Sequence, residues 1–367
     1  MANPSLPAVP ADPAEAVDRV IDILLASADL AAIELGRRLG WYAALSGRPP
    51  ATCAELAALV GSNPRYTREW CEQQAASGLL RVEGDDGPEE ARRYALPDAV
   101  ATVLADGGSS IYLTPLVRQV AAALGMLPRI AEAARTGEGL GWAEYGPDML
   151  EGQAESNRNA FLADLPTWIA AMPDVEARLH AGPSRIADIG CGAAWSSIGL
   201  ARAYPAAAVD AYDINPASVE MARRNVVDAG LAGRVHVVLA DAADLATATD
   251  AGPYDLLTAF ECLHDLPDPV GVLAAMRAMA GPQAAVLVAD EAVRERFSAP
   301  AGRLERLMYG ISLLVCLPDS MSTSPSAATG TVMRPPVLRR YAEQAGYGSV
   351  EVLDVEHDMW RFYRLNP

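Results

Sequence analysis

The stretch Ile186-Ala187-Asp188-Ile189-Gly190-Cys191-Gly192-Ala193-Ala194-Trp195 decides the fold of the second half of this sequence. Its apolar start predicts a buried strand, its glycines predict a tight turn, and the pattern that follows predicts a helix. Gly190 permits a positive φ in the turn, and Gly192 lets the backbone approach a ligand closely. The dinucleotide-binding fingerprint G-x-G-x-x-G is not met, because position 195 is Trp. The two glycines alone are therefore also consistent with a strand-to-helix turn that binds nothing.

Around this stretch, short apolar runs alternate with helical patterns. Strands are expected at residues 185–189, 208–213, 235–240, 254–260, 285–290, 349–355 and 360–365. The helices expected between them cover residues 196–204, 216–229, 269–280 and 335–345. Strands that are buried on both faces and separated by helices form parallel sheets with right-handed crossovers. The sequence therefore predicts an α/β domain with a Rossmann-like, seven-stranded, mostly parallel sheet.

Acidic residues end three consecutive predicted strands, at Asp188, Asp213 and Asp241. The carboxyl ends of parallel strands meet at one edge of an open α/β sheet, which is where such sheets bind ligands. A carboxylate at Asp213 can accept both hydroxyls of a ribose, and one at Asp241 can accept the amino group of a base. Taken singly, each aspartate is more often a solvated strand end or a helix cap.

Together these residues resemble the class I S-adenosylmethionine-dependent methyltransferases over about residues 182–367. The resemblance implies S-adenosyl-L-methionine as the cofactor and S-adenosyl-L-homocysteine as its product. It puts Gly190 and Gly192 against the amino-acid part of the cofactor, Asp213 at the ribose, and Asp241 at the adenine. The complete expected cofactor set is Asp188, Gly190, Gly192, Asp213, Ile214, Asp241, Ala242, Phe260 and Glu261. Ala194 stands where many members have a third glycine, so we expect local repacking there.

The N-terminal part follows the order of a winged helix. Helical periodicity from Val17 gives two successive helical stretches that end near Leu39. Thr52 and Glu55 predict a capping box, and Pro64 suits the start of the next helix. Residues 79–83 and 93–96 then predict a small hairpin. Small-molecule methyltransferases, including plant-type O-methyltransferases and bacterial natural-product enzymes, join such a domain to a class I core and dimerise through it, so the resemblance implies a homodimer.

Four segments are therefore expected: a disordered leader at 1–16, a winged-helix-like dimerisation domain at 17–105, helices at 106–181 that form a wall of the substrate pocket, and the catalytic domain at 182–367. An insertion at about 292–334 interrupts the catalytic domain before its last crossover helix. In the families that this chain resembles, such an insertion covers the substrate.

His264 and Asp265 follow the fourth predicted strand of the sheet. Histidine titrates near neutral pH, so His264 can take a proton from a hydroxyl while a methyl group is transferred. The pair resembles the His-Asp of plant-type O-methyltransferases, which implies that His264 is the general base. Asp265 then either orients the imidazole or caps the following helix. Plant-type enzymes also have glutamates that flank the histidine, and Glu261 and Glu291 are the candidates for these positions by their location. A loop histidine bonded to backbone remains the alternative.

Aromatic and methionine side chains in the helical wall and the insertion are candidates to line an apolar substrate cavity. They are Tyr112, Trp142, Tyr145, Trp168, Met308 and Tyr309. For any one of them, an ordinary core position is the more common role.

Composition excludes several kinds of protein. The 367 residues carry a net charge of −18 and contain no lysine, so lysine Schiff-base chemistry is ruled out and nucleic acid or anionic membranes are unfavourable partners. The five cysteines are scattered without a C-x-x-C pair, which indicates neither a disulfide framework nor a metal site. With no signal peptide or long apolar run, we expect a cytoplasmic location.

Three functions remain open. The first is methyl transfer from S-adenosylmethionine to an oxygen, or less readily a nitrogen, of an apolar small molecule in bacterial secondary metabolism. The second is a rearrangement, cyclisation or elimination in which the bound cofactor keeps its methyl group. The third is a regulator that binds DNA through the winged helix, which the acidic residues of the predicted wing disfavour.

Overall fold

The computed structural model describes residues 9–84, 88–247 and 252–366. These residues form two compact units. The larger unit contains residues 123–150 and 160–366, and the smaller contains residues 9–122 and 151–159. The helical segment expected at 106–181 is thus divided between the two units.

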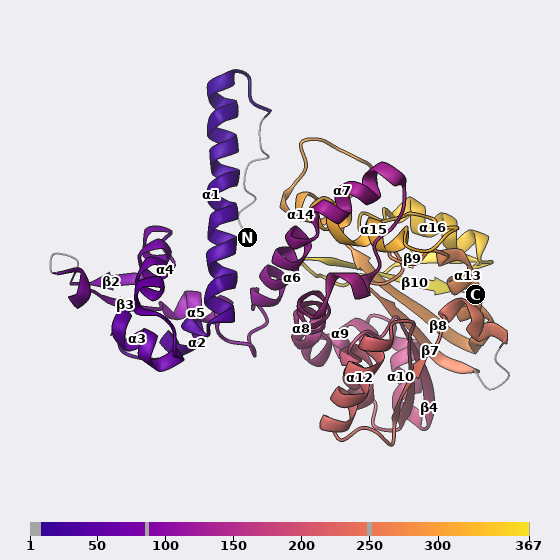
Figure 1. Ribbon diagram of the computed structural model, residues 1–367. Helices are drawn as coiled ribbons and strands as arrows, with labels where there is room; N and C mark the ends of the chain where they lie inside the picture. The colour runs from indigo at the N-terminus through magenta and orange to yellow at the C-terminus, as the bar shows by residue number, and fades with distance from the viewer. Residues whose placement is uncertain (1–8, 85–87, 248–251, 367) are drawn as a thin grey trace. The chain divides into compact units, whose positions relative to one another are not determined.

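A seven-stranded sheet forms the centre of the larger unit (Figure 1). Its strands are β4 (Ser184–Ile189), β5 (Ala207–Asp213), β6 (Val235–Leu239), β7 (Tyr254–Phe260), β8 (Ala280–Glu291), β9 (Ser349–Val352) and β10 (Trp360–Asn366). They lie in the order β6-β5-β4-β7-β8-β10-β9. Strands β4 to β8 run parallel, and β10 is antiparallel to both of its neighbours. The predicted α/β class and the mostly parallel sheet are confirmed.

The central strands of this sheet, β4, β7 and β8, are buried on both faces, whereas the edge strands β6 and β9 are largely exposed. On β4, Ile186 packs into one apolar cluster, whereas Ala187 and Ile189 pack into the other. The first cluster includes side chains of α9 (Leu165–Ala170), α10 (Pro173–Ala181), α11 (Trp195–Ala203) and α12 (Pro216–Asp228). The second includes side chains of α13 (Pro269–Met279) and α16 (Pro335–Gln344). Burial on both faces explains why these strands are continuous apolar runs in the sequence.

The remaining helices of the larger unit lie in its N-terminal segment, between β6 and β7, and in the insertion. They are α7 (Leu127–Thr136), η2 (Trp142–Tyr145), η3 (Ala242–Thr247), α14 (Arg303–Ile311), the π-helical turn η4 (Ser312–Cys316) and α15 (Leu317–Ser320). Helix α8 (Pro147–Ala163) contributes residues to both units. The 3₁₀ turn η3 and the π-helical turn η4 were not predicted from the sequence.

The smaller unit has the helices and the small sheet of a winged helix. Its elements are α1 (Pro13–Arg38), α2 (Trp41–Leu45), β1 (Ala51–Thr52), α3 (Cys53–Val60), α4 (Pro64–Ala76), β2 (Arg81–Glu83), η1 (Glu89–Ala91), β3 (Arg93–Ala95) and α5 (Asp98–Leu104). Helix α6 (Thr114–Gly125) follows, and its residues from Ala123 on belong to the larger unit. The strands form an antiparallel sheet in the order β1-β3-β2. The predicted capping box is present, because Thr52 and Glu55 exchange side-chain and backbone hydrogen bonds at the start of α3.

Helix α1 corrects two predictions. It is one continuous helix of 26 residues, not two successive stretches, and it begins at Pro13, inside the leader expected at 1–16. The Asp12 carboxylate accepts from the backbone of Ala14 and Glu15, and Pro13 occupies the first turn, so both capping rules favour this start. Residues 1–8 of the expected leader lie outside the described residues.

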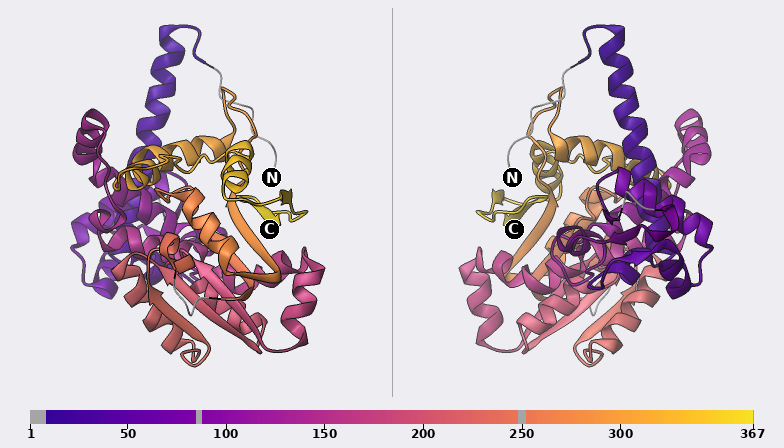
Figure 2. Two further views of the ribbon diagram at one scale, coloured as in Figure 1. Left: turned by 90° about the vertical axis from the view of Figure 1, so that its right-hand side faces the viewer. Right: turned by 90° about the vertical axis from the view of Figure 1, so that its left-hand side faces the viewer.

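The first half of α1 extends beyond the other helices of its unit (Figures 1 and 2). Large apolar side chains on this half are about 48–60% exposed: Val17, Val20, Ile21, Ile23, Leu24 and Leu25. A run of this size is unusual on a surface that faces only water.

Candidate active site

The glycine turn after β4 holds three residues at positive φ. Gly190 has a φ of 66°, Gly192 of 52° and Ala194 of 63°. A Cβ at Gly190 would lie 2.7 Å from Cys262 Cβ, whereas a Cβ at Gly192 would meet nothing within 4 Å. Gly190 is therefore required by packing, and Gly192 leaves an open backbone position that a ligand can fill. Ala194 adopts the left-handed conformation that a glycine would take at less cost.

Asp188 is buried and saturated with hydrogen bonds. It accepts from the hydroxyls of Ser196 (2.6 Å), Ser197 (2.6 Å) and Thr258 (2.7 Å). Burial raises the pKa of this carboxyl, and the three hydroxyls oppose that shift. Asp188 thus fastens the end of β4 to α11 and β7. Its expected contact with the cofactor has no support in this geometry.

Asp213, at the end of β5, joins the neighbouring strand end to the glycine turn. One carboxylate oxygen accepts from the Gly192 amide at 2.8 Å, and the other accepts from the Asn215 amide at 2.8 Å. Burial raises the pKa of Asp213, while these amides lower it. The next side chain, Ile214, is 62% exposed. An apolar surface, a carboxylate and an open glycine therefore lie at one edge of the sheet.

The other expected cofactor residues occupy different kinds of position. Asp241 is exposed, and its carboxylate accepts from the Ala243 amide at the first turn of η3, which begins at Ala242. Phe260 is buried in an aromatic cluster with Phe161, Trp168, Trp360 and Phe362. The Glu261 carboxylate accepts from the indole N–H of Trp360. Phe260, the last residue of β7, thus belongs to the apolar core on one face of the sheet.

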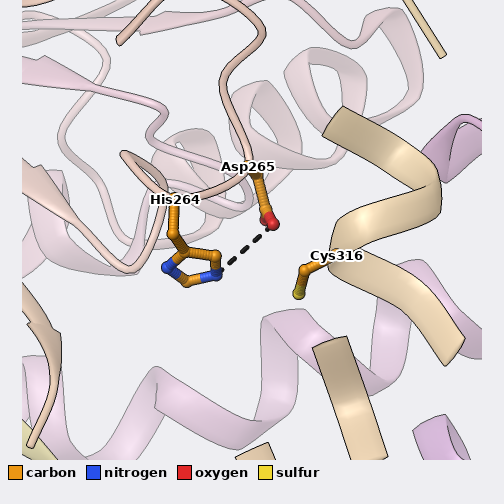
Figure 3. A group of neighbouring side chains, drawn as sticks. All are labelled: His264, Asp265 and Cys316. Atoms are coloured by element: carbon orange, nitrogen blue, oxygen red, sulfur yellow. Dashed lines mark ion pairs between the residues drawn. The ribbon is translucent and has the colours of Figure 1, made fainter. Parts of the chain in front are cut away.

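His264 lies in the loop after β7 and is 3% exposed. Its Nδ1 is 3.0 Å from Asp290 Oδ1 in hydrogen-bond geometry and 3.8 Å from Glu291 Oε2. Its Nε2 is 3.3 Å from Asp265 Oδ1 (Figure 3). Asp290, at the end of β8, was missed by sequence reasoning. Its position one residue before Glu291, at the end of an apolar strand, was the available signal.

The contacts also decide between the two roles considered for Asp265. Asp268, and not Asp265, caps α13, because the Asp268 carboxylate accepts from the Gly271 amide at 2.8 Å. Asp265 instead faces His264. Of the two candidate flanking glutamates, Glu291 lies beside the imidazole, and Glu261 binds Trp360.

The electrostatics of this group are dominated by burial and by excess negative charge. Burial lowers the pKa of His264, but Asp290, Asp265 and Glu291 outweigh it, so this pKa lies well above its ordinary value. Burial raises the pKa of Glu291 well above its usual range and also raises that of Asp265, which the His264 charge opposes. Asp319 is affected in the same way, with a pKa of about 8 caused by burial and then by Asp265.

Cys316 completes the group and was also missed. Its thiol, 5% exposed, lies beside His264 and Asp265 (Figure 3). It belongs to η4, so the insertion at 292–334 contributes to the group around His264. Burial raises the pKa of Cys316 to about 12.

The expected substrate-lining residues divide into separate groups. Trp142 lies beside this site, because its backbone amide donates to Asp319 at 2.8 Å and its side chain favours the charged form of Asp265. Trp168 and Met308 are almost fully buried, and Trp168 packs in the aromatic core described above, which is typical of a core residue.

Two further residues of the expected set, Tyr145 and Tyr309, contact or belong to the insertion at 292–334. The buried Tyr145 donates its hydroxyl to the Leu314 carbonyl at 2.7 Å. Tyr309 is 40% exposed and accepts from Arg334 at 3.0 Å. Tyr112 belongs to the smaller unit.

Comparisons with known proteins agree with this geometry. Residues 186–283 match the family model described as a methyltransferase domain, and residues 27–106 match an Rv2258c-like winged HTH domain. The chain is 34% identical over 108 residues to the ubiquinone biosynthesis O-methyltransferase of Xanthomonas axonopodis pv. citri. The aligned stretch covers 29% of this chain and 43% of that protein. The match to the corresponding enzyme of Aromatoleum aromaticum is 28% over 176 residues, 47% of this chain and 68% of the relative. The chain thus spans less than half the length of the first of these curated relatives.

Solved structures show the same fold over nearly the whole chain. An O-methyltransferase family protein from Burkholderia thailandensis has a TM-score of 0.70 at 17% identity, covering 98% of both chains. The mitomycin 7-O-methyltransferase has a TM-score of 0.69 at 19% identity, covering 96% of this chain and 98% of that one. Human N-acetylserotonin methyltransferase in complex with SAM has a TM-score of 0.64 at 18% identity, covering 98% and 99%.

Within the part of the chain that the structure describes, none of the helices combines the length and the apolar character needed to cross a bilayer.

The matched family models, the seven-stranded sheet and the strand order lead to one conclusion: this chain carries a methyltransferase domain of the class I fold behind an N-terminal winged helix-turn-helix domain.

Proposed function

We propose that this protein transfers a methyl group from S-adenosylmethionine to an oxygen atom of an apolar small molecule. The observation that carries the proposal is the His264–Asp290 pair at the carboxyl edge of the sheet. Nδ1 lies 3.0 Å from Asp290 Oδ1, and with Nδ1–H donating to this carboxylate, Nε2 is the nitrogen that we propose as the proton acceptor. Solved relatives with the same fold include a mitomycin 7-O-methyltransferase and a methyltransferase bound to SAM.

The residues at the glycine turn fit the cofactor. The open position at Gly192, the Asp213 carboxylate and the exposed Ile214 side chain offer backbone, polar and apolar contacts to a nucleoside. Asp241 and Ala242 are proposed to lie at the base. When bound, S-adenosylmethionine supplies a methyl group on a sulfonium centre, and S-adenosylhomocysteine remains after transfer.

The protein has three tasks in this reaction. It aligns the acceptor oxygen with the methyl group, excludes water and removes one proton. We assign the last task to His264: the acceptor O–H proton moves to Nε2 as the new carbon–oxygen bond forms and the carbon–sulfur bond breaks. Asp290 stabilises the resulting imidazolium through Nδ1, and Asp265, 3.3 Å from Nε2, faces the same space.

The winged helix is proposed to serve dimerisation and not DNA binding. Its arginines are engaged by carboxylates, in the pairs Arg68–Glu89 (2.5 Å), Arg92–Glu72 (3.2 Å) and Arg93–Glu55 (2.9 Å). Arginines held in this way are poor ligands for phosphates. The exposed apolar half of α1 is the surface proposed to meet a second copy of the chain. The free cysteines suit a reducing compartment, and we propose the cytoplasm.

The test has two stages. Calorimetry with S-adenosylhomocysteine on the purified full-length chain should show one binding event per chain. Absence of heat for folded protein would contradict the cofactor assignment. Phenolic and hydroxylated apolar acceptors are then screened for S-adenosylhomocysteine formed one-for-one with methylated product. Product without S-adenosylhomocysteine would instead indicate a reaction in which the cofactor keeps its methyl group.

A further inference from the structure

Asp319 is a partly buried acid that the insertion brings to the group around His264. The side-chain ends of Cys316, His264 and Asp265 converge (Figure 3). Asp319 follows Cys316 by three residues on the continuous helical segment formed by η4 and α15. Residues three apart on a helix lie on the same face. Asp319 therefore lies about one turn beyond Cys316, on the face that carries the thiol to His264.

The segment around the start of η2 holds the Asp319 carboxylate in place. Asp319 Oδ1 accepts from the Trp142 amide at 2.8 Å, and the Leu140 amide donates to the Pro318 carbonyl at 2.8 Å. Within the part of the chain that the structure describes, the second oxygen of Asp319 receives no hydrogen bond, and the carboxylate forms no ion pair with an arginine. One oxygen is thus fixed by the backbone, and the other is available to a ligand.

The charges that act on Asp319 locate it relative to the sheet. Burial raises the pKa of Asp319 to about 8, and the charges of Asp265 and Asp213 add to this shift. The Trp142 amide and the His264 charge oppose it. Asp265 follows β7 and Asp213 ends β5, and these two strands pair with opposite edges of β4. An acid within electrostatic reach of both places lies near the end of β4, where the chain makes its glycine turn.

The other acids near Asp319 are compensated by groups of the protein. Asp213 accepts from two backbone amides, and Asp265 faces the His264 imidazole. In η2, the Glu144 carboxylate is paired with an arginine of α7. Asp319 receives one backbone amide, so it has the weakest compensation of these four acids.

We propose that the Asp319 carboxylate recognises the positive sulfonium centre of S-adenosylmethionine and thereby distinguishes this cofactor from S-adenosylhomocysteine, whose sulfur is neutral. The inference rests on the proposed function, which places the methyl donor between the glycine turn and His264. The two ligands share the nucleoside and the amino-acid group, and they differ only in the methyl group and the charge at sulfur. One carboxylate near the sulfur is therefore sufficient to separate them.

The protonation of Asp319 suits this role. Before a cation binds, the carboxyl keeps its proton at neutral pH, so no uncompensated charge is buried there. A positive charge within about 4–6 Å lowers the pKa of a carboxyl by about 1–3 pH units. Binding of the sulfonium therefore releases the Asp319 proton to solvent and forms an ion pair. After methyl transfer the sulfur is neutral, Asp319 takes up a proton from solvent, and the product loses this attraction.

Calorimetry on the full-length protein at pH 7, with each of the two ligands, tests the inference. Asp319→Asn keeps an acceptor for the Trp142 amide and removes the charge. We expect about tenfold weaker binding of S-adenosylmethionine and a less than about twofold change for S-adenosylhomocysteine, because only the first ligand carries a positive sulfur. Equal losses for both ligands, or no loss for either, would overturn the proposal.

Asp268→Asn is the matched control. It makes the same change at an exposed acid in the loop that also carries His264, and asparagine caps a helix as well as aspartate does. The ratio of the two dissociation constants should stay at the wild-type value in this control. A ratio that falls as far as in Asp319→Asn would show a general effect of charge and refute the specific role of Asp319.

Proton release gives a second readout, which a purely structural role of Asp319 would not change. Titrations with S-adenosylmethionine at pH 7, in two buffers with different enthalpies of ionisation, report the protons released on binding. Wild type should release up to about one proton per chain more than Asp319→Asn, because the carboxyl is protonated before binding and ionised afterwards. Protons from the ligand itself cancel in this comparison. Equal release from the two proteins would refute the ionisation of Asp319.

A measurement on the unmodified protein covers the case in which Asp319→Asn does not fold. Wild type should release more protons with S-adenosylmethionine than with S-adenosylhomocysteine, and equal release would contradict the inference. Failure of both ligands to bind the folded chain would contradict the proposed function together with this inference. Binding of both ligands with a ratio that Asp319→Asn leaves unchanged would refute the inference alone.

Discussion

Two buried aspartates of the larger unit, Asp188 and Asp265, have opposite surroundings. Asp188 receives three hydroxyl hydrogen bonds from Ser196, Ser197 and Thr258, which satisfy its charge within the protein. Asp265 has a buried oxygen with no hydrogen-bond partner among the described residues and an imidazole 3.3 Å away. The saturated carboxylate holds the fold together, and the unsaturated one is available to a ligand or a proton. The same residue type thus stabilises the fold at the end of β4 and keeps an unpaired oxygen in the loop after β7.

The largest effect is expected at the imidazole. His264→Ala should lower kcat about 10²–10⁴-fold if Nε2 takes the acceptor proton. The pKa of His264 lies above its ordinary value, so the imidazolium loses its proton only at higher pH, and wild-type kcat should rise through a pKa above 6.5. The variant should lack this rise. Unchanged kcat and an unchanged pH profile would remove His264 from the mechanism.

The glycine turn gives the next effect, through a pair of substitutions. Gly190→Ala adds a positive-φ cost of about 1–2 kcal/mol and a clash with Cys262, worth about 1–3 kcal/mol. Gly192→Ala carries the φ cost without a clash. Thermal unfolding should therefore show a clearly larger loss for Gly190→Ala. Calorimetry should show weaker S-adenosylhomocysteine binding for Gly192→Ala, and full affinity in that variant would contradict the open ligand position.

The comparison of the two aspartates is tested by replacing each with asparagine. Asp188→Asn weakens three charge-assisted hydrogen bonds and should cost about 2 kcal/mol of unfolding free energy, or about 4–8 °C in Tm. Asp265→Asn should change stability by less than about 1 kcal/mol, because one of its oxygens makes no hydrogen bond. Equal losses of stability in the two variants would contradict the distinction.

The smallest effect is expected at Asp319. Its pKa of about 8 lies far above the ordinary 3.8, so the folded state keeps this carboxyl protonated and loses stability as pH rises from about 4 to 8. Asp319→Asn retains an acceptor for the Trp142 amide and removes that penalty. The Tm of the variant relative to wild type should increase between pH 5 and pH 8. A constant difference would show that Asp319 is ionised in the folded protein.

Sequence patterns predicted the elements whose signals are local. The strand at 254–260 was located at the observed bounds of β7, and the capping box at Thr52 and Glu55 is present. Strand β8 is longer than expected, because its first residues lack the apolar run that marks its second half. Helix α1 was predicted as two successive helical stretches, each with apolar residues at helical spacing, whereas it is one continuous helix. The large apolar side chains on its first half are exposed.

The sequence by itself determined the parallel sheet, the glycine turn and the place of His264 at a strand end, because each follows from the order of residues along one segment. Tertiary structure alone decided the partners of His264. Asp290 and Cys316 are 26 and 52 residues away in the chain, and no periodicity relates them to His264. They meet because adjacent parallel strands end at the same edge and because a π-helical turn in the insertion presents the thiol there. The chemistry of the site depends on distances across the fold, which sequence spacing does not encode.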